Sequence, residues 1–303
     1  MATRLPSMLT TRQQVYGYSM AIFAAIGFSG KAILIKLAYV MPVDAVTLLT
    51  LRMLFAAPFF LVAALYHVQH KANSSLAYRD CLLIVALGIL GYYLSSLFDF
   101  IGLHYISAGL ERLILFLYPT MVVLLSAIFL QKPFGRKEII ALVLSYAGIA
   151  VVFEHELALA NENIIVGASF VFISTLTYAA YLIGTGEIVV RVGASRFTAY
   201  AMLIASVAVV VHFLLTHSVQ ALVLPVKVYE LSFYMAIFST VLPVFLLSAS
   251  IRLIGSSHTS LIGLLGPVST LILAQMFLGE QLSLQQMLGA ALVVLGVMSL
   301  SLK

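Results

Sequence analysis

Charged side chains are scarce in this sequence, because Asp, Glu, Lys and Arg together make up only 9% of its 303 residues. A soluble domain carries about 25% of such residues. So few charges cannot cover a water-facing surface, whereas hydrophobic residues account for 63% of the chain. Lipid is therefore the expected main solvent, and a soluble enzyme is excluded.

Cysteine is nearly absent, and so are the patterns of metal sites and cleaved leaders. The single Cys81 leaves no partner for an intramolecular disulfide and no set of thiolates for a metal ion. The HExxH pattern of zinc proteases does not occur. Segment 1–14 is polar and lacks an early apolar core with a cleavage site, so we expect no cleaved signal peptide. Neither a cofactor nor a metal ion is expected.

Long apolar stretches fill most of the chain. Crossing the hydrocarbon takes about 20 mostly apolar residues. Breaks at Pro, Gly and polar clusters predict ten spans, near 15–36, 45–66, 80–100, 107–131, 137–153, 164–185, 197–216, 228–251, 257–278 and 283–302. The predicted fold is an all-α polytopic membrane protein with ten transmembrane helices, short loops, and residues 1–14 as a cytoplasmic tail.

The positive side chains predict the orientation of these spans. With the N-terminus in the cytoplasm, eleven of the sixteen Lys and Arg residues fall in inner segments, namely Arg4, Arg12, Lys71, Arg79, Lys132, Arg136, Lys137, Arg191, Arg196, Arg252 and Lys303. The outer loops hold two, Lys36 and Lys227, with the acidic residues Glu154, Glu156 and Glu162. This bias indicates cytoplasmic N- and C-termini. It explains the basic composition without nucleic acid, and we expect a bacterial inner membrane protein.

An internal repeat relates the two halves of the chain. Residues 106–149 align without a gap with 254–297, at an offset of 148 residues. The identical pairs include Ile106/Ile254, Leu113/Leu261, Ile114/Ile262, Pro119/Pro267, Phe129/Phe277, Leu130/Leu278, Leu144/Leu292 and Gly148/Gly296. At an offset of 150, Gly17 meets Gly167. Each half, 15–153 and 164–303, holds five spans. Because five is odd, equivalent helices cross in opposite directions, which predicts inverted repeats of the kind found in secondary carriers.

The same residues resemble a known family. Gly102–Gly109, followed by Leu113–Ile114 and Leu117–Pro119, is similar to the first EamA-type repeat of the drug/metabolite transporter superfamily. The second repeat is matched by Leu265–Pro267, Phe277–Glu280, Gly289 and Gly296, while Lys31 and Leu51–Arg52 fit the start of such a domain. The sequence departs at Lys132, where the pattern usually has Glu, and at Ala141, where it usually has Gly. The resemblance implies a metabolite transporter, favours efflux over uptake, and leaves the substrate open.

Ionisable residues inside spans are costly and mark functional candidates. Five lie towards the outer third, on four helices: Lys31, Arg52, Asp99, Glu111 and Arg112. One interpretation is an ion-pair network that closes an outer gate or captures an anionic or zwitterionic solute. The other is that Lys31 and Arg52 reach lipid headgroups while the carboxylates face water near helix ends. Asp99 and Glu111 are also the candidates for coupling to protons, which nearby cations would oppose.

Other polar and aromatic residues are candidates for a binding pocket. They are Tyr118, Tyr178, Tyr181, His258, Ser260 and Gln275, although interfacial anchoring also explains tyrosines in membranes. Pro119 and Pro267 free the carbonyls of Leu115 and Gly263 and are predicted as hinges, or as simple packing kinks. Pro243 adds a kink without a sequence partner. The small residues Ala141, Gly148, Gly289 and Gly296 suit close helix packing.

We therefore expect a secondary transporter, not an enzyme, that moves a small polar or amphipathic metabolite, such as an amino acid, by alternating access. The oligomeric state does not follow from these residues. One alternative is a lipid or lipid-linked headgroup translocase on the same scaffold. Another is an intramembrane serine protease, because Gly27–Gly30 matches a GxSG pattern and His258 is a conceivable base for Ser29. The expected topology places Ser29 and His258 near opposite membrane faces, which disfavours the protease.

Overall fold

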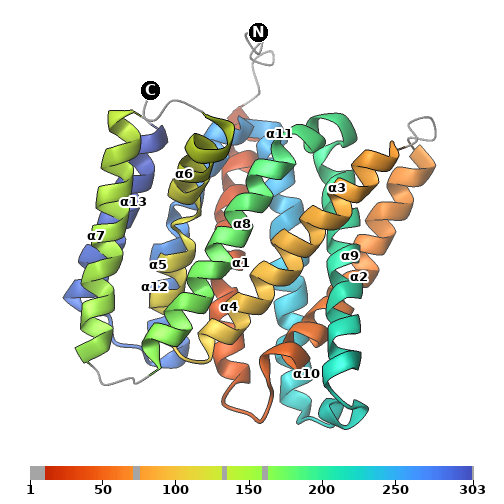
Figure 1. Ribbon diagram of the computed structural model, residues 1–303, viewed down its shortest axis with the longest axis horizontal. Helices are drawn as coiled ribbons and strands as arrows, with labels where there is room; N and C mark the ends of the chain where they lie inside the picture. Colours follow the sequence, from red (N-terminus) through yellow and green to blue (C-terminus); the bar gives the residue numbers. More distant parts are fainter. Residues whose placement is uncertain (1–10, 71–75, 132–134, 159–162, 302–303) are drawn as a thin grey trace.

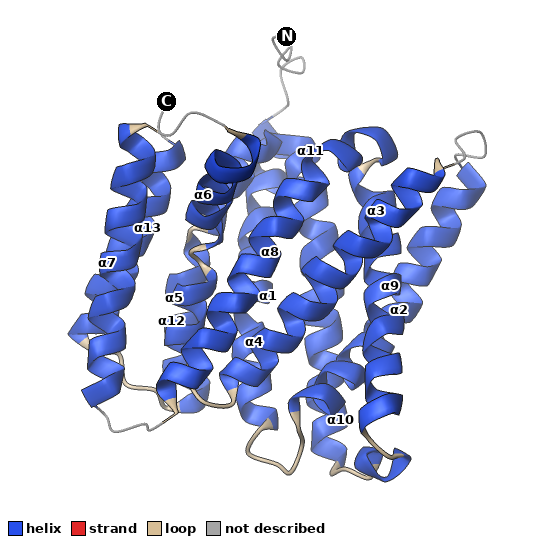
Figure 2. Cartoon of the chain, viewed as in Figure 1, coloured by secondary structure: helices blue, strands red, loops and turns tan. Residues whose placement is uncertain are grey.

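Every regular element in the part of the chain that the structure describes is a helix (Figure 2). The computed structural model describes residues 11–70, 76–131, 135–158 and 163–301. In chain order the elements are α1 Thr11–Ala38, α2 Ala45–His70, α3 Tyr78–Gly88, the π-helix η1 Ile89–Leu94, α4 Ser95–Leu103, α5 Ala108–Leu115, α6 Tyr118–Leu130, α7 Arg136–Ala158, α8 Ile164–Val192, α9 Ala194–Thr216, the 3-10 helix η2 Val219–Leu222, α10 Val226–Ala236, the π-helix η3 Ile237–Val241, α11 Leu242–Gly263, α12 Leu265–Leu278 and α13 Leu284–Ser301.

The lengths and compositions of these helices confirm a polytopic membrane protein. Seven helical stretches are long and apolar enough to cross a membrane: Arg12–Ala38, Ala45–Tyr66, Tyr78–Leu103, Ala108–Leu130, Ile164–Gly186, Ala194–Thr216 and Val226–Gly255. Leu265–Leu278 and Leu284–Ser299 are shorter apolar helices, and α7 is a further helix of 23 residues. The predicted count of ten spans stays a prediction. Arg4, Lys71, Lys132, Glu162 and Lys303, used above to predict the orientation, lie outside the described residues.

The helices form one bundle whose outer surface is apolar. Large side chains such as Phe23, Leu215 and Val62 are 64%, 80% and 67% exposed. In water such a continuous apolar surface would drive association, whereas lipid solvates it. The first helix, α1, begins at the end of the bundle at which α13 ends (Figure 1). The described termini therefore share one face, as the predicted orientation requires.

Two spans are interrupted one turn before a proline. α5 ends at Leu115 and α6 begins at Tyr118, next to Pro119. In the same way α11 ends at Gly263 and α12 begins at Leu265, two residues before Pro267. Because proline has no amide hydrogen, the carbonyl four residues earlier loses its helical partner. Both predicted kinks are thus present, 148 residues apart, whereas their role as hinges stays a prediction.

The π-helical segments recur at the same interval. η1 begins at Ile89 and η3 begins at Ile237, which again lie 148 residues apart. Pro243, which has no partner in the sequence, lies two residues after the end of η3. Its counterpart at the same offset is Ser95, directly after η1, so η1 forms without a following proline. The π-helix therefore recurs in both halves of the backbone although the residue types at the two places differ.

Close contacts between helices are also duplicated. A methyl group on Gly17 of α1 would lie 2.5 Å from Ile254 of α11, and one on Gly167 of α8 would lie 2.7 Å from Ile106. These two contacts are counterparts under the sequence repeat. α7 and α13 pack against each other through the predicted small residues: a methyl group on Gly148 would lie 2.6 Å from the carbonyl oxygen of Gly289, and one on Gly296 would lie 2.9 Å from that of Ala141. The expected role of these residues in close packing is confirmed.

Candidate functional site

A buried ammonium group enclosed by two carboxylates lies between α1, α4 and α5. Lys31 Nζ is 2.5 Å from Asp99 Oδ2 and 3.3 Å from Glu111 Oε1. Asp99 and Glu111 are 2% and 0% exposed, and the Lys31 side chain is 16% exposed. All three residues were predicted as candidates from the sequence, but the sequence did not predict their contacts with one another. Headgroup contact is thereby disfavoured for Lys31, because its charge is used inside the bundle.

The local sequence places Glu111 in this position. Ser107 caps α5, accepting a hydrogen bond from the amide of Leu110 at 3.1 Å. Glu111 follows in the first turn, where the amide groups of a helix favour a negative charge. Its side chain then points into the bundle towards α1 rather than towards lipid.

Arg52 on α2 links this cluster to the second half of the chain. Its Nε donates a hydrogen bond of 2.9 Å to the hydroxyl of Thr240 in η3. Its guanidinium lies 5.5 Å from the centre of the Phe100 ring, within the range of a cation–π contact. Arg52 is only 7% exposed, so it does not reach headgroups. Sequence reasoning missed Thr240 and Phe100, because neither residue type is unusual in an apolar helix.

Arg112 extends the cluster across the interrupted helices. A methyl group on Gly266 would lie 2.5 Å from Arg112 Nη2, so the guanidinium packs directly against this glycine. The carbonyl oxygen of Gly266 accepts a 3.0 Å hydrogen bond from the Ser29 hydroxyl. Ser29, which the sequence suggested as a possible nucleophile, therefore ties α1 to α12 beside Arg112.

Four tyrosines form a second, aromatic group. Tyr118 and Tyr178 meet edge to face at 5.5 Å, and Tyr178 stacks on Tyr181 at 5.6 Å. The Tyr181 hydroxyl donates a hydrogen bond of 3.0 Å to the hydroxyl of Tyr92 in η1. Tyr118, Tyr178 and Tyr181 therefore form one group with Tyr92, which the sequence did not single out.

His258 and Gln275 do not join these groups. His258 is exposed, its Nδ1 lies 3.0 Å from the carbonyl oxygen of Ile254, and its ring centre lies 6.2 Å from that of Tyr18. Gln275 is exposed on α12. The side chain of Ser260 lies outside the described part of the chain. No group of three His, Cys, Asp or Glu side chains in the described segments is arranged to hold a metal ion.

The charged cluster has free hydrogen-bonding capacity of both kinds. Asp99 Oδ1, Arg52 Nη1 and Arg112 Nε are buried without a hydrogen-bond partner. The Glu111 oxygens also make no hydrogen bond, although Oε1 lies 3.3 Å from Lys31 Nζ in the ion pair. Buried polar atoms normally have partners. Three cationic and two acidic side chains thus offer donors and acceptors to a small polar ligand.

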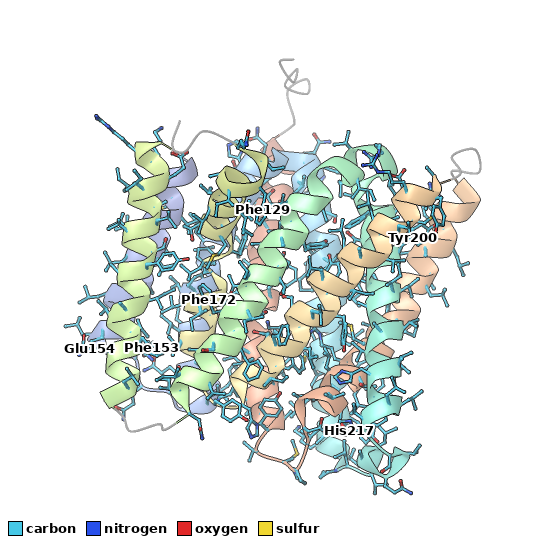
Figure 3. All side chains as sticks on the ribbon, in the orientation of Figure 1. Phe129, Phe153, Glu154, Phe172, Tyr200 and His217 are labelled. Carbon is cyan, nitrogen blue, oxygen red and sulfur yellow. The ribbon has the colours of Figure 1, made fainter. Side chains whose placement is uncertain are left out.

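An apolar groove of about 340 Å³ opens sideways between α5, α7 and α8. Figure 3 labels two of its lining residues, Phe153 on α7 and Phe172 on α8. Ile114 and Leu117 form its inner wall, and Tyr146 and Ser169 are its polar lining residues. No charged residue of the cluster lines this groove.

Comparison with known proteins relates the whole chain to transporters. The EamA-like transporter family matches residues 15–154 and 165–302. The chain is 31% identical to the uncharacterized transporter YcbK of Bacillus subtilis (strain 168), over 92% of this chain and 90% of that protein. An uncharacterized transporter of Archaeoglobus fulgidus is 26% identical, over 79% of this chain and 84% of the relative. A solved structure titled "Crystal structure of protein" has a TM-score of 0.65 at 17% identity, covers 94% of this chain and 96% of its own, and shows the fold alone.

Proposed function

Because the chain belongs to the EamA-like transporter family, we propose that it is a secondary carrier that exports a small polar or amphipathic metabolite, such as an amino acid, by alternating access. The buried cluster of Lys31, Asp99 and Glu111, with Arg52 and Arg112 beside it, is the observation on which this proposal rests. Charges within membrane-spanning helices are retained where they serve a substrate or ion pathway. Opposite charges suit a solute that carries both an amino and a carboxylate group.

We further propose that ten helices cross the membrane as two inverted five-helix repeats, 15–153 and 164–303. The duplicated interruptions, π-helices and glycine contacts support this arrangement, since each recurs at an offset of 148 to 150 residues. An inverted repeat gives a carrier two related conformations, open to opposite sides. Pro119 and Pro267 would then act as hinges at equivalent places.

The membrane proposed for this carrier is the bacterial inner membrane, with both termini in the cytoplasm. Helix ends at the face where α1 begins carry Arg12, Arg79, Arg136, Arg191 and Arg196 (Figure 1). The opposite face has Lys36 and Lys227 near helix ends. This distribution agrees with an excess of positive charge on the cytoplasmic side.

Two other functions have less support. The sideways groove would admit an acyl chain and favours a lipid or lipid-linked headgroup translocase, but no charged side chain lines it for a headgroup. A serine protease would need Ser29 beside His258. The ring beside His258 belongs to Tyr18, eleven residues from Ser29, or about 16 Å along the helix axis. Ser29→Ala would abolish proteolysis and leave a carrier active.

Transport assays with a neutralised carboxylate test the proposal. Uptake and efflux would be measured in vesicles against a metabolite panel, with and without a pH gradient. Glu111→Gln is expected to impair transport of any active substrate at least tenfold while membrane insertion stays normal, because Lys31 loses one partner. Glu154→Gln, which changes an exposed carboxylate on α7, serves as the matched control. Wild-type transport by Glu111→Gln would contradict a role of the cluster, and a response to the pH gradient would support protons as the coupling ion.

A further inference from the structure

The beginning of α5 is held by a side chain from the other half of the protein. Glu280 Oε1 accepts a 3.0 Å hydrogen bond from the amide of Ala108, and its Oε2 accepts one of 3.4 Å from the amide of Gly109. The first amide groups of a helix have no partner within it. Together with the Ser107 cap, Glu280 therefore completes the hydrogen bonding of this turn. Figure 1 shows α5 beside α12, near the bundle end opposite the described termini.

Glu280 lies in a short connection between α12 and α13 that has hydrogen bonds at both ends. α12 ends in Gly279, whose left-handed conformation (φ 70°) lets the chain turn back, and the Glu280 amide donates to the carbonyl of Ala274 at 3.3 Å. On the other side, Ser283 and Gln286 exchange hydrogen bonds of 3.1 and 3.2 Å in a capping box at the start of α13. Hydrogen bonds therefore bound the connection that carries Glu280 at both of its ends.

The turn that Glu280 holds also carries the charged cluster. Glu111 lies one turn after Ala108, and its amide bonds to the carbonyl of Ser107 at 3.0 Å. Its side chain pairs with Lys31 on α1. Ala108 is 0% exposed, so releasing Glu280 would leave buried amide groups without partners unless this turn moved.

We propose that Glu280 is a positioning residue for transport: it clasps the start of α5, holds Glu111 against Lys31, and keeps this end of the bundle closed. The role of this contact in transport rests on the carrier function proposed above. Opening towards this face then requires Glu280 to release the two amide groups. No other carboxylate in the described segments contacts the start of α5 in this way.

Cysteine labelling tests this clasp without a substrate. In a Cys81→Ser background, Ala108→Cys places a buried reporter under the clasp, and a membrane-impermeant maleimide is added from outside the cell. Glu280→Ala is expected to speed labelling of the reporter by roughly 5- to 30-fold, the range for loss of a helix cap. Glu280→Gln should have a smaller effect, because its amide oxygen still accepts a hydrogen bond. Glu230→Ala removes an exposed carboxylate on α10 and should change nothing.

A second reporter separates opening from unfolding. Ala205→Cys lies fully buried on α9 and should stay unlabelled in every Glu280 variant. Unchanged labelling at position 108 in Glu280→Ala would overturn the proposal, and so would equal increases at positions 108 and 205. If position 108 responds but no metabolite is transported, the clasp stands while the proposed substrate class fails.

Discussion

Lys31 is paired with two carboxylates that are only 2% and 0% exposed, so its removal is expected to cost more than the loss of a surface pair. We expect Lys31→Met to lower the free energy of unfolding by about 3–5 kcal/mol, the range for breaking a buried ion pair from one side. Combining it with Asp99→Asn should recover most of that loss, because one uncompensated charge is then removed. Thermal unfolding in detergent measures both.

Lys227 provides the control for this experiment, because it pairs with Glu230 on the exposed surface. Lys227→Met should melt at the wild-type temperature, since exposed pairs contribute little. A Lys31→Met variant that also melts like the wild type would show that the buried cluster does not stabilise the bundle.

Asp44, which lies between α1 and α2 outside the membrane-spanning segments, should make the stability of the protein depend on pH. Partial burial would raise the pKa of its carboxyl, but hydrogen bonds from Thr47 and Val46 and the nearby His217 imidazole outweigh burial and lower it. His217 Nε2 lies 3.3 Å from Asp44 Oδ1, and Figure 3 labels this histidine at the end of α9. Because the pKa of Asp44 is lower in the folded protein than in the unfolded chain, its ionised carboxylate stabilises the fold at pH values above the ordinary pKa of about 3.9. This stabilisation is lost as the pH falls through the pKa of the folded state.

Melting temperatures in detergent between pH 6 and pH 3 check this sign. The wild type should exceed Asp44→Asn at pH 6, because the amide caps α2 but carries no charge for His217. The difference should shrink as the pH falls below about 4. A difference that grows on acidification would contradict the assignment.

At the scale of single residues, the sequence predicted the charges better than their partners. Lys31, Asp99 and Glu111 stand out because ionisable groups are rare in apolar spans. Thr240 and Gly266, which contact the two arginines, carry no such signal. Gln275 was a candidate only because it is polar, and a break next to Pro267 makes the direction of a side chain beyond it impossible to read from periodicity.

At the scale of helices, the close approach of α7 and α13 can be tested by substituting a glycine at their contact. A methyl group on Gly289 would lie 2.5 Å from the carbonyl oxygen of Gly148 and 2.3 Å from Val152. We expect Gly289→Ala to lower the free energy of unfolding by about 1–3 kcal/mol, since the backbones must separate. Thermal unfolding measures this loss.

Gly186→Ala is the matched control, because this glycine in α8 has nothing within 4 Å of an added methyl group. Alanine favours helix more than glycine by about 1 kcal/mol, so Gly186→Ala should melt at or above the wild-type temperature. Equal losses in both variants would mean that helix propensity, not the α7–α13 contact, controls the result.

Helix positions were largely predictable from apolar length, and helix breaks only in part. Pro119 and Pro267 predicted the interruptions because proline removes a backbone hydrogen bond. The π-helix η1 contains no proline, so nothing in its residue types distinguishes it from a regular turn. By contrast, the break at Gly255, with φ 82°, falls between the predicted spans 228–251 and 257–278, and glycine tolerates that conformation.

For the whole molecule, the orientation in the membrane is directly measurable. Alkaline phosphatase fused after Lys303 should be inactive, because the enzyme folds only outside the cytoplasm and the C-terminus is proposed to lie inside. A fusion truncated after Pro225, between α9 and α10, should be active. Activity of the Lys303 fusion would reverse or break the proposed topology and with it the inverted repeat.

The repeat itself was visible in the sequence through paired prolines and glycines, but its contacts were not. Gly17 and Gly167 aligned by identity, whereas their common packing against Ile254 and Ile106 required coordinates. The clasp between Glu280 and α5 was also hidden, because it joins residues 172 positions apart.

The paired contacts between α7 and α13 bear on how such a protein can diverge. In a dimer of two identical five-helix chains, Gly148–Gly289 and Ala141–Gly296 would be the same contact occurring twice. Every mutation would then change both copies of that contact. Fusion into a single polypeptide frees each copy to change alone. Ala141 and Gly289 occupy equivalent positions and already differ, as do Lys132 and Glu280. Joining the halves thus permits the two faces of the protein to evolve unequal strengths of closure.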